Sequence, residues 1–197
     1  MKTLHCLIAA ALLSAIATSA GAANLIKNGS FEKPVVPDGS FQYFSTGEKF
    51  RNWTVVGARN IAIVSEDLNY CGHTFPAKYG VQFVDLTGDT NSATGLQQNI
   101  DTTPGSAYSL SFLIGNVYDS LYNCGTSSTV NVLIDGVAAA SFTNRAGKGS
   151  TTIAWRKFST EFVAQHATTT IALINGDPPA DTANGLDAVN VSLVAAP

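Results

Sequence analysis

Short runs of alternating apolar and polar residues, separated by clusters of Gly, Pro, Asn and Asp, constrain the fold of this chain most strongly. Side chains of a β-strand alternate between two faces, so such runs predict strands, and no segment after residue 23 keeps a sustained helical stripe. The predicted strands are 53–57, 60–64, 79–86, 95–100, 107–115, 130–135, 155–162, 168–174 and 187–194, with a further strand near Leu25.

Nine or ten short strands in one domain predict an all-β fold, a two-sheet antiparallel β-sandwich of the jelly-roll type. Asp135-Gly136 stands between two strand-like runs and predicts a β-hairpin. Trp53 begins a short alternating run, so we expect it in the core and not on a sugar-binding surface.

The first residues have the features of a secretory signal peptide. Lys2 gives a basic start, residues 7–17 are apolar, and small residues precede position 24. We expect residues 1–23 to be removed and residues 24–197 to form a single domain. The protein is then expected to be secreted, or periplasmic in a Gram-negative cell, and not anchored in a membrane.

The charge balance disfavours two classes of partner. The chain has 11 Lys and Arg against 14 Asp and Glu, and only 13% of its residues are charged. Nucleic acids and anionic membranes are bound by clustered basic residues, whereas the basic residues here are scattered. We therefore expect no nucleic-acid partner and no membrane insertion.

Two cysteines remain after the signal peptide, Cys71 and Cys124. An oxidising compartment favours one disulfide between them, which would tie together the loops 65–78 and 116–128. The alternatives are two buried free thiols or half of a metal site. Neither a second Cys pair nor suitably spaced His residues support a zinc site.

Two acidic residues near opposite ends of the domain predict a cation site. Asp187 is in phase with Val189 and Val191, so it should face the core, and no Lys or Arg lies near it in the sequence. A buried carboxylate needs a partner. We expect Asp187 to meet Glu32 and to share a calcium ion with it, since calcium binds carboxylate and carbonyl oxygens. The alternatives are a solvated Glu32 and an Asp187 that caps a turn.

The two long loops hold the candidate ligand-binding residues. Tyrosine rings in polar loops can stack on sugar rings, while amides and carboxylates can orient sugar hydroxyls. The alternative is ordinary turn chemistry and, for the histidine, a hydrogen bond to the backbone at the start of a strand. The candidates are Tyr70, His73, Asn116, Tyr118, Asp119 and Tyr122.

Several motifs in this order resemble the DUF642 family of secreted, cell-wall-associated proteins and, more broadly, galactose-binding-like jelly-roll domains. They are Asn-Gly-Ser-Phe-Glu at 28–32, Trp-Thr-Val-Val-Gly at 53–57, the run from His73 to Gly80 leading into Val84-Asp85-Leu86, Tyr-Ser-Leu-Ser-Phe at 108–112, and Leu-Asp-Ala-Val at 186–189. The resemblance implies a structural calcium near the terminal strands and binding of cell-wall or extracellular polysaccharide. The family pattern commonly has two consecutive acids near the end, whereas here Ala188 follows Asp187.

Three functions are compatible with these observations. The first is a secreted, non-catalytic carbohydrate-binding protein. The second is a structural or adhesive protein that binds cell-wall or matrix proteins. The third is a small glycoside hydrolase, which would need two carboxylates across a cleft. Candidate carboxylates for hydrolysis are Asp67, Asp85, Asp89 and Asp119, whereas no Gly-x-Ser-x-Gly motif supports a serine nucleophile.

Overall fold

The computed structural model describes residues 23–70, 72–118, 125–178 and 183–194, and this part of the chain contains strands and no helix. The strands, in chain order, are β1 (Phe41–Ser45), β2 (Lys49–Phe50), β3 (Trp53–Gly57), β4 (Asn60–Ser65), β5 (Asn69–Tyr70), β6 (His73–Thr74), β7 (Gln82–Asp85), β8 (Thr94–Asp101), β9 (Ala107–Asn116), β10 (Ser128–Ile134), β11 (Val137–Asn144), β12 (Ala154–Val163), β13 (Thr168–Asn175) and β14 (Asn184–Leu193).

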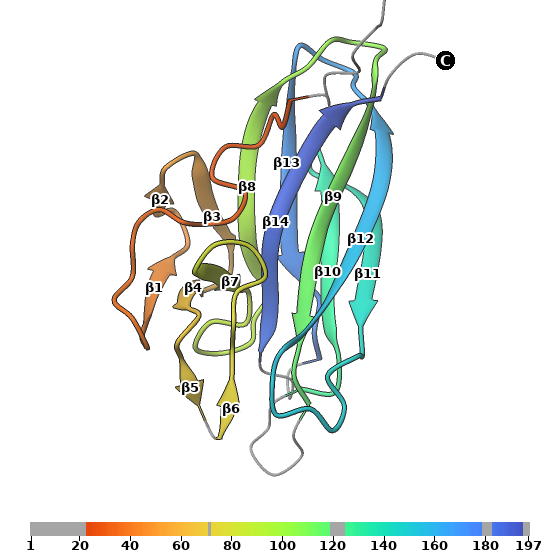
Figure 1. The fold of residues 1–197 in the computed structure, drawn as a ribbon. Coiled ribbons are helices and arrows are strands. Elements are labelled where there is room, and N and C mark those ends of the chain that lie inside the picture. Colours follow the sequence, from red (N-terminus) through yellow and green to blue (C-terminus); the bar gives the residue numbers. More distant parts are fainter. Residues whose placement is uncertain (1–22, 71, 119–124, 179–182, 195–197) are drawn as a thin grey trace, which may run out of the picture.

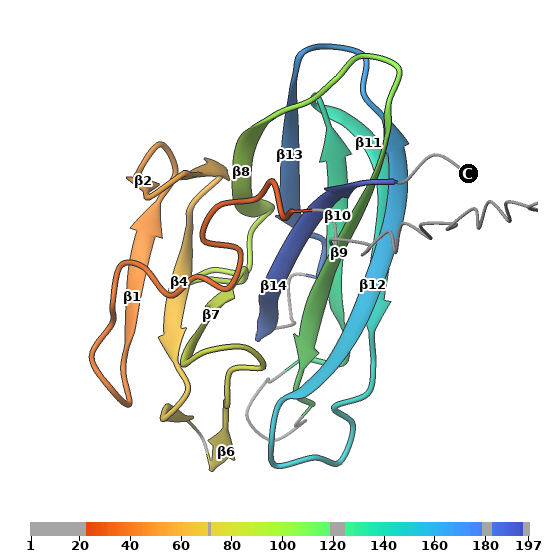
Figure 2. The same cartoon turned by 45° about the horizontal axis from the view of Figure 1, so that its top comes forward.

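The strands form two six-stranded antiparallel sheets that pack face to face. The first sheet has the order β1-β4-β7-β14-β9-β12, and the second has the order β11-β10-β13-β8-β3-β2. In Figure 1 the strands β14, β9 and β12 lie in front of β13, β10 and β11, and Figure 2 shows the same two layers after rotation. A separate pair, β5-β6, extends from one end. The predicted all-β, two-sheet jelly-roll is confirmed.

The core lies between the sheets and contains the predicted tryptophan. Trp53 is fully buried, and its indole Nε1 donates to the carbonyl of Asn28 at 3.0 Å. The rings of Trp53 and Phe31 lie 5.4 Å apart, so the segment before β1 also contributes to the core. The ring is buried and its N–H has a hydrogen-bond acceptor, as expected of a Trp in a protein core.

The predicted hairpin is confirmed. Asp135 and Gly136 connect β10 to β11 with φ angles of 50° and 78°. Both values lie in the left-handed region that the two central residues of this tight turn require. The strands β10 and β11 pair antiparallel from Ile134 and Val137 onward.

The structure differs from the predicted strands in three ways. The segment near Leu25 forms no strand, although the N–H of Leu25 donates to the carbonyl of Val191 in β14 at 2.8 Å. The strand predicted over 79–86 begins only at Gln82, and Val81 is exposed. The first strand, β1, was not predicted, because four of its five residues are exposed and show no alternation.

The strand β4 is buried on both faces. Ile61 and Ile63 face the main core, whereas Ala62 and Val64 belong to a second apolar cluster on the outer face of the first sheet. Phe75, Phe83, Val117 and Ile153 complete this second cluster. The outer face of the first sheet is therefore covered by chain around β4 and β7, and a binding surface on it would be partly enclosed.

Candidate functional site

The structure brings the two predicted acids to the same segment of chain. Asp187 is buried, and its Oδ2 accepts hydrogen bonds from the N–H groups of Lys78 at 3.0 Å and Tyr79 at 2.8 Å. Glu32 accepts from the N–H groups of Val81 at 3.1 Å and Gln82 at 3.2 Å, both through Oε1. We call this arrangement of Glu32, Asp187 and residues 78–82 the carboxylate clamp.

Both carboxylates of the clamp are already satisfied by protein. The second oxygen of Glu32 also accepts from Val81, and Asp187 Oδ1 accepts from the N–H of Ala188 at 2.5 Å. These N–H groups take up several of the acceptor positions of the two carboxylates. The described residues contain no group of three or more His, Cys, Asp or Glu suited to a metal. A calcium ion at the clamp would have to share these oxygens with the backbone donors, and calcium binding stays a prediction.

The environment of Asp187 favours its neutral form. Burial raises the pKa of the Asp187 carboxyl from 3.8 to about 6, and the negative charge of Glu32 adds to this rise. The N–H groups of Tyr79, Ala188 and Lys78 oppose it by stabilising the anion. Glu32 and Asp187 therefore hold the same short segment of chain, whereas a cation shared between them stays a prediction.

The predicted loop residues are found in different surroundings. Tyr70 is 58% exposed on β5 and lines a cavity. His73 is buried on β6. Asn116 is fully buried: its amide donates to Ser128 Oγ at 3.2 Å and accepts from the N–H of Gly147 at 2.9 Å. Burial of this amide among protein partners does not fit a direct contact with ligand.

The remaining predictions for these loops stay untested. Tyr118 is half-buried and its N–H donates to the carbonyl of Gly147 at 3.3 Å. Asp119 and Tyr122 lie outside the described residues, as do both cysteines of the predicted disulfide, Cys71 and Cys124. The signal peptide over 1–23 also falls outside them, except for its last residue.

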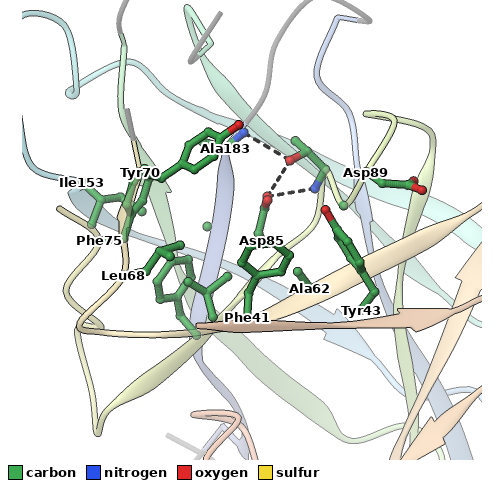
Figure 3. Close-up of a pocket in the computed structure, with 15 residues that line it drawn as sticks. Phe41, Tyr43, Ala62, Leu68, Tyr70, Phe75, Asp85, Asp89, Ile153 and Ala183 are labelled. Atoms are coloured by element: carbon green, nitrogen blue, oxygen red, sulfur yellow. Dashed lines mark hydrogen bonds between the residues drawn. The ribbon is translucent and has the colours of Figure 1, made fainter. Parts of the chain in front are cut away.

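A cavity of about 300 Å³ opens on the outer face of the first sheet (Figure 3). We call it the aromatic cavity. Its lining comes from β1, β4, β5, β7, the turn after β7, the loop before β12 and the start of β14. The lining residues are Phe41, Tyr43, Ala62, Val64, Leu68, Tyr70, Phe75, Phe83, Asp85, Thr87, Gly88, Asp89, Ile153, Ala183 and Gly185.

Four residues that are paired across β1, β4, β7 and β14 form the floor of the aromatic cavity. Tyr43 pairs with Ala62, Ala62 with Asp85, and Asp85 with Gly185. Residues paired directly across antiparallel strands share a face of the sheet, so these four residues form one row. Ala62 and Gly185 are small, which leaves depth between Tyr43 and the rest of the lining.

Three exposed aromatic rings line this cavity. Phe41 is 42% exposed, Tyr43 45% and Tyr70 58%. Phe41 and Tyr43 are two residues apart on β1, and their ring centroids lie 5.2 Å apart with the planes inclined by 64°. Large aromatic rings left partly in water beside a cavity offer apolar surface that a ligand can cover.

Asp85 is the polar group on the floor. Its Oδ1 accepts from Thr87 N at 3.0 Å, Thr87 Oγ1 at 2.7 Å and Asn184 N at 3.1 Å. No hydrogen bond from the described residues reaches Oδ2. Burial raises the pKa of the Asp85 carboxyl, while these hydrogen bonds oppose the rise. The pKa of Tyr43 is also raised, first by burial and then by the charges of Asp85 and Asp89.

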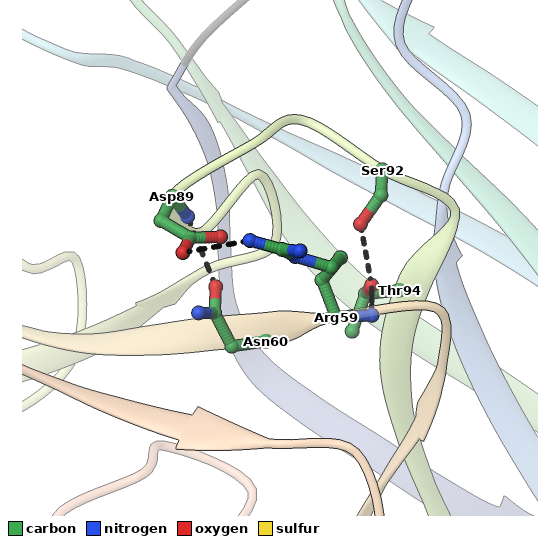
Figure 4. A network of polar contacts seen from close by, with 5 residues as sticks. All are labelled: Arg59, Asn60, Asp89, Ser92 and Thr94. Atoms are coloured by element: carbon green, nitrogen blue, oxygen red, sulfur yellow. Dashed lines mark hydrogen bonds and ion pairs between the residues drawn. The ribbon is translucent and has the colours of Figure 1, made fainter.

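Asp89 lies at the rim and is held by a polar network (Figure 4). Its Oδ2 is 3.5 Å from a guanidinium nitrogen of Arg59, and its N–H donates to Asn60 Oδ1 at 2.9 Å. Thr94 Oγ1 accepts from the N–H of Arg59 at 2.9 Å, which anchors the backbone at the start of β4. The aromatic cavity therefore has two carboxyl groups, Asp85 on its floor and Asp89 at its rim.

The sequence did not reveal most of this site. Phe41 and Tyr43 were missed because β1 shows no alternation. Asp85 and Asp89 were named as candidate acids of a hydrolase, and Asp85 also as part of a family motif, but neither was named as a ligand-binding residue. Tyr70 was found from its place in a polar loop. A signal that could have led to Asp85 is its position beside Phe83, in a strand whose neighbours are apolar on both faces.

A second cavity, of about 430 Å³, is lined by polar residues of β2, β3, β8 and the β2–β3 turn, Lys49, Arg51 and Gln97 among them. Its aromatic residue, Trp53, is fully buried and paired with Asn28. This cavity offers no exposed ring, so the aromatic cavity is the better candidate for binding an organic ligand. No helix capable of crossing a membrane occurs in the described ranges.

The sequence matches a protein family, and the fold matches solved structures. Residues 24–192 match the family described as "Protein of unknown function (DUF642)". No curated protein matches the sequence significantly. A solved cyclase from Fischerella sp. TAU is similar, with 19% identity, a TM-score of 0.60, and coverage of 88% of this chain and 98% of the cyclase.

The chain is also similar to the CBM22-1 xylan-binding domain of Xyn10C from Paenibacillus barcinonensis. The identity is 16% and the TM-score 0.51, over 82% of this chain and 99% of that domain. At these identities the likeness establishes the fold, the galactose-binding-like jelly-roll that is also found in carbohydrate-binding modules.

A substitution at Gly80 tests whether the carboxylate clamp stabilises the protein. Gly80 has a φ of 78°, and a Cβ at this position would lie 2.3 Å from Glu32 Oε1. Gly80→Ala must therefore displace the Glu32 carboxylate from its backbone donors. Gly105 is the matched control, since its φ is 80° and a Cβ there meets nothing within 4 Å.

We expect Gly80→Ala to lower the free energy of unfolding by about 2 kcal/mol more than Gly105→Ala, measured by denaturant titration. The backbone strain of a positive φ is common to both variants, so the difference reports the lost hydrogen bonds to Glu32. Equal losses would contradict a stabilising role for the clamp.

Asp187 predicts a dependence of stability on pH. Its pKa is about 6 in the folded protein against 3.8 for an unperturbed group. Between these values the folded state holds more protons than the unfolded state, so stability falls as pH rises from about 4 to about 6. The shift of roughly 2 pKa units corresponds to a loss on the order of 3 kcal/mol.

Asp187→Asn should remove this part of the pH dependence, because the amide does not titrate. The measurement is the free energy of unfolding of both proteins at several pH values between about 4 and 7. Parallel curves for the two proteins would show that Asp187 does not titrate as described.

Calcium binding at the clamp is tested by melting at neutral pH. A ligand that binds only the folded state raises the melting temperature. If the predicted calcium site exists, replacing a chelator by excess calcium raises the melting temperature of the wild type and not that of Asp187→Asn. An unchanged wild-type melting temperature would rule out a stabilising site.

Proposed function

This chain belongs to the DUF642 family, and we propose that it is a secreted, non-catalytic protein that binds cell-wall or extracellular polysaccharide through the aromatic cavity. One observation carries the proposal: the exposed rings of Phe41, Tyr43 and Tyr70 surround a carboxyl group, Asp85, and one oxygen of this group accepts no hydrogen bond from the described residues.

This combination suits a sugar chemically. The C–H faces of a pyranose ring are apolar and pack on aromatic rings, while its hydroxyl groups need fixed polar partners. The aromatic cavity has both kinds of surface, with apolar rings on β1 and β5 and carboxyl groups on the floor and rim. Its volume of about 300 Å³ is at the lower end of ligand sites, which suits one or two sugar residues of a longer chain.

The fold supports the proposal independently of the cavity. The similar CBM22-1 domain is described as xylan-binding, and it covers most of this chain at a TM-score of 0.51. A soluble xylan is therefore one suitable probe, together with other neutral polysaccharides such as β-glucan and galactan.

Two exposed tyrosines provide a matched test. Tyr70 lines the aromatic cavity and is 58% exposed, whereas Tyr79 is 60% exposed and lies outside the cavity lining. We expect Tyr70→Ala to weaken binding to a retained polysaccharide about tenfold, since loss of a stacking ring costs about 1.4 kcal/mol. Tyr79→Ala should bind as the wild type does.

The measurement is affinity electrophoresis or calorimetry with each polysaccharide, after thermal melting has shown that both variants are folded. Equal weakening by the two substitutions would move the site away from the aromatic cavity. If the wild type retains no polysaccharide and captures a purified cell-wall or matrix protein, the adhesive function replaces the carbohydrate-binding one.

One observation favours a second candidate function, acid catalysis on a bound glycan. A carboxyl group whose pKa is raised by burial keeps its proton more readily than an exposed one, as a general acid must, and Asp85 is such a group beside a second carboxyl, Asp89. Release of reducing sugar from a retained polysaccharide by the wild type, and its loss in Asp85→Asn with binding preserved, would establish catalysis. No release over prolonged incubation supports binding alone.

A further inference from the structure

The aromatic cavity contains carboxyl groups and no basic side chain. Its lining includes two acids, Asp85 and Asp89, and no Lys, Arg or His. Arg59 pairs with Asp89 at 3.5 Å from outside the lining, and the two side chains are 56% and 36% exposed. The ion pair between Arg59 and Asp89 is the only one within the described ranges, so Asp85 on the floor has no cationic partner there.

The hydrogen bonds of Asp85 leave one oxygen for a ligand. Thr87 and Asn184 supply three donors, and all three reach Oδ1. These donors fix the plane of the carboxyl group and are neutral, so they stabilise a negative charge without cancelling it. A donor that also carries a positive charge would make the strongest partner for Oδ2.

The rings around this oxygen add a second attraction for cations. The faces of Phe and Tyr rings are electron-rich and attract an ammonium group that lies over them. Phe41, Tyr43 and Tyr70 present partly exposed rings to the same cavity. Figure 3 shows Asp85 among these three labelled side chains, with Asp89 beyond Tyr43.

We infer that the aromatic cavity selects a glycan bearing a protonated amine, an amino sugar with a free ammonium group, over neutral and carboxylated sugars. The ammonium group binds Asp85 Oδ2, and the sugar ring packs on the aromatic rings. A uronic acid is disfavoured by repulsion from Asp85 and Asp89. This inference rests on the proposed carbohydrate-binding function and names the class of its ligand.

The test uses two ligands that differ only at the amine. Glucosamine oligomers and N-acetylglucosamine oligomers of the same length share ring and linkage, but only the first carries a charge at about pH 6. A galacturonic acid oligomer supplies the acidic comparison. We expect the wild type to bind the glucosamine oligomer at least tenfold more tightly than the acetylated one, measured by calorimetry at low salt.

Two variants assign the preference to the floor of the cavity. Asp85→Asn keeps an oxygen for Thr87 and Asn184 and replaces the other oxygen by a neutral amide. It should reduce the ratio of the two affinities to within about twofold, mainly by weakening the glucosamine oligomer. Asp101→Asn, an exposed change of the same charge outside the cavity lining, should leave the ratio unchanged.

The outcomes separate this inference from the proposed function. Equal or tighter binding of the acetylated oligomer by the wild type overturns the inference and leaves carbohydrate binding intact. A preference that survives in a folded Asp85→Asn, or that Asp101→Asn also removes, overturns the assignment to the cavity. No binding of these oligomers or of any neutral polysaccharide overturns both proposals. Because the wild-type ratio is decisive by itself, the test stands even if Asp85→Asn fails to fold.

Discussion

The candidate site depends on the hydrogen bonds by which two carboxylates, Glu32 and Asp187, hold residues 78–82 at the start of β7. Glu32 precedes the first strand and Asp187 lies in the last one, and between them they hold the N–H groups of Lys78, Tyr79, Val81 and Gln82. These bonds anchor the chain where it enters β7, which begins at Gln82. Strand β7 then pairs with β4 on one side and with β14 on the other.

Register decides which side chains face the cavity. A shift of one residue in β7 would turn Asp85 into the core between the sheets and Val84 out of it. In the observed register Asp85 lies between Ala62 and Gly185, on the face that also carries Tyr43. The site thus combines a position fixed by backbone hydrogen bonds with depth provided by small neighbours. A buried carboxyl group is tolerated there because three donors satisfy one of its oxygens.

The predictability of each element follows from how it is buried. Strands with one face in the core, such as β10 and β13, alternate in the sequence and were predicted within two residues of their ends. Strand β4 has apolar residues on both faces, so its continuous run was also recognised. Strand β1 buries only Phe44, and no alternation marked it. Because β1 was not predicted, Phe41 and Tyr43 were not identified, and these are two of the three exposed rings that line the aromatic cavity. Of the predicted loop residues, Tyr70 lines the cavity, whereas Asn116 is an internal hydrogen-bonding residue.

The sequence by itself determined the all-β class, most strands, the Asp135-Gly136 hairpin and the buried Trp53. These features depend on the alternation of apolar and polar residues and on turn chemistry, both of which can be recognised from neighbouring residues in the sequence. The tertiary structure alone decided that the partners of the two acids are backbone N–H groups, and that Tyr43, Ala62, Asp85 and Gly185 form one row. Both outcomes depend on the pairing of strands distant in sequence, and the spacing of residues along a single strand carries no information about which residue stands opposite.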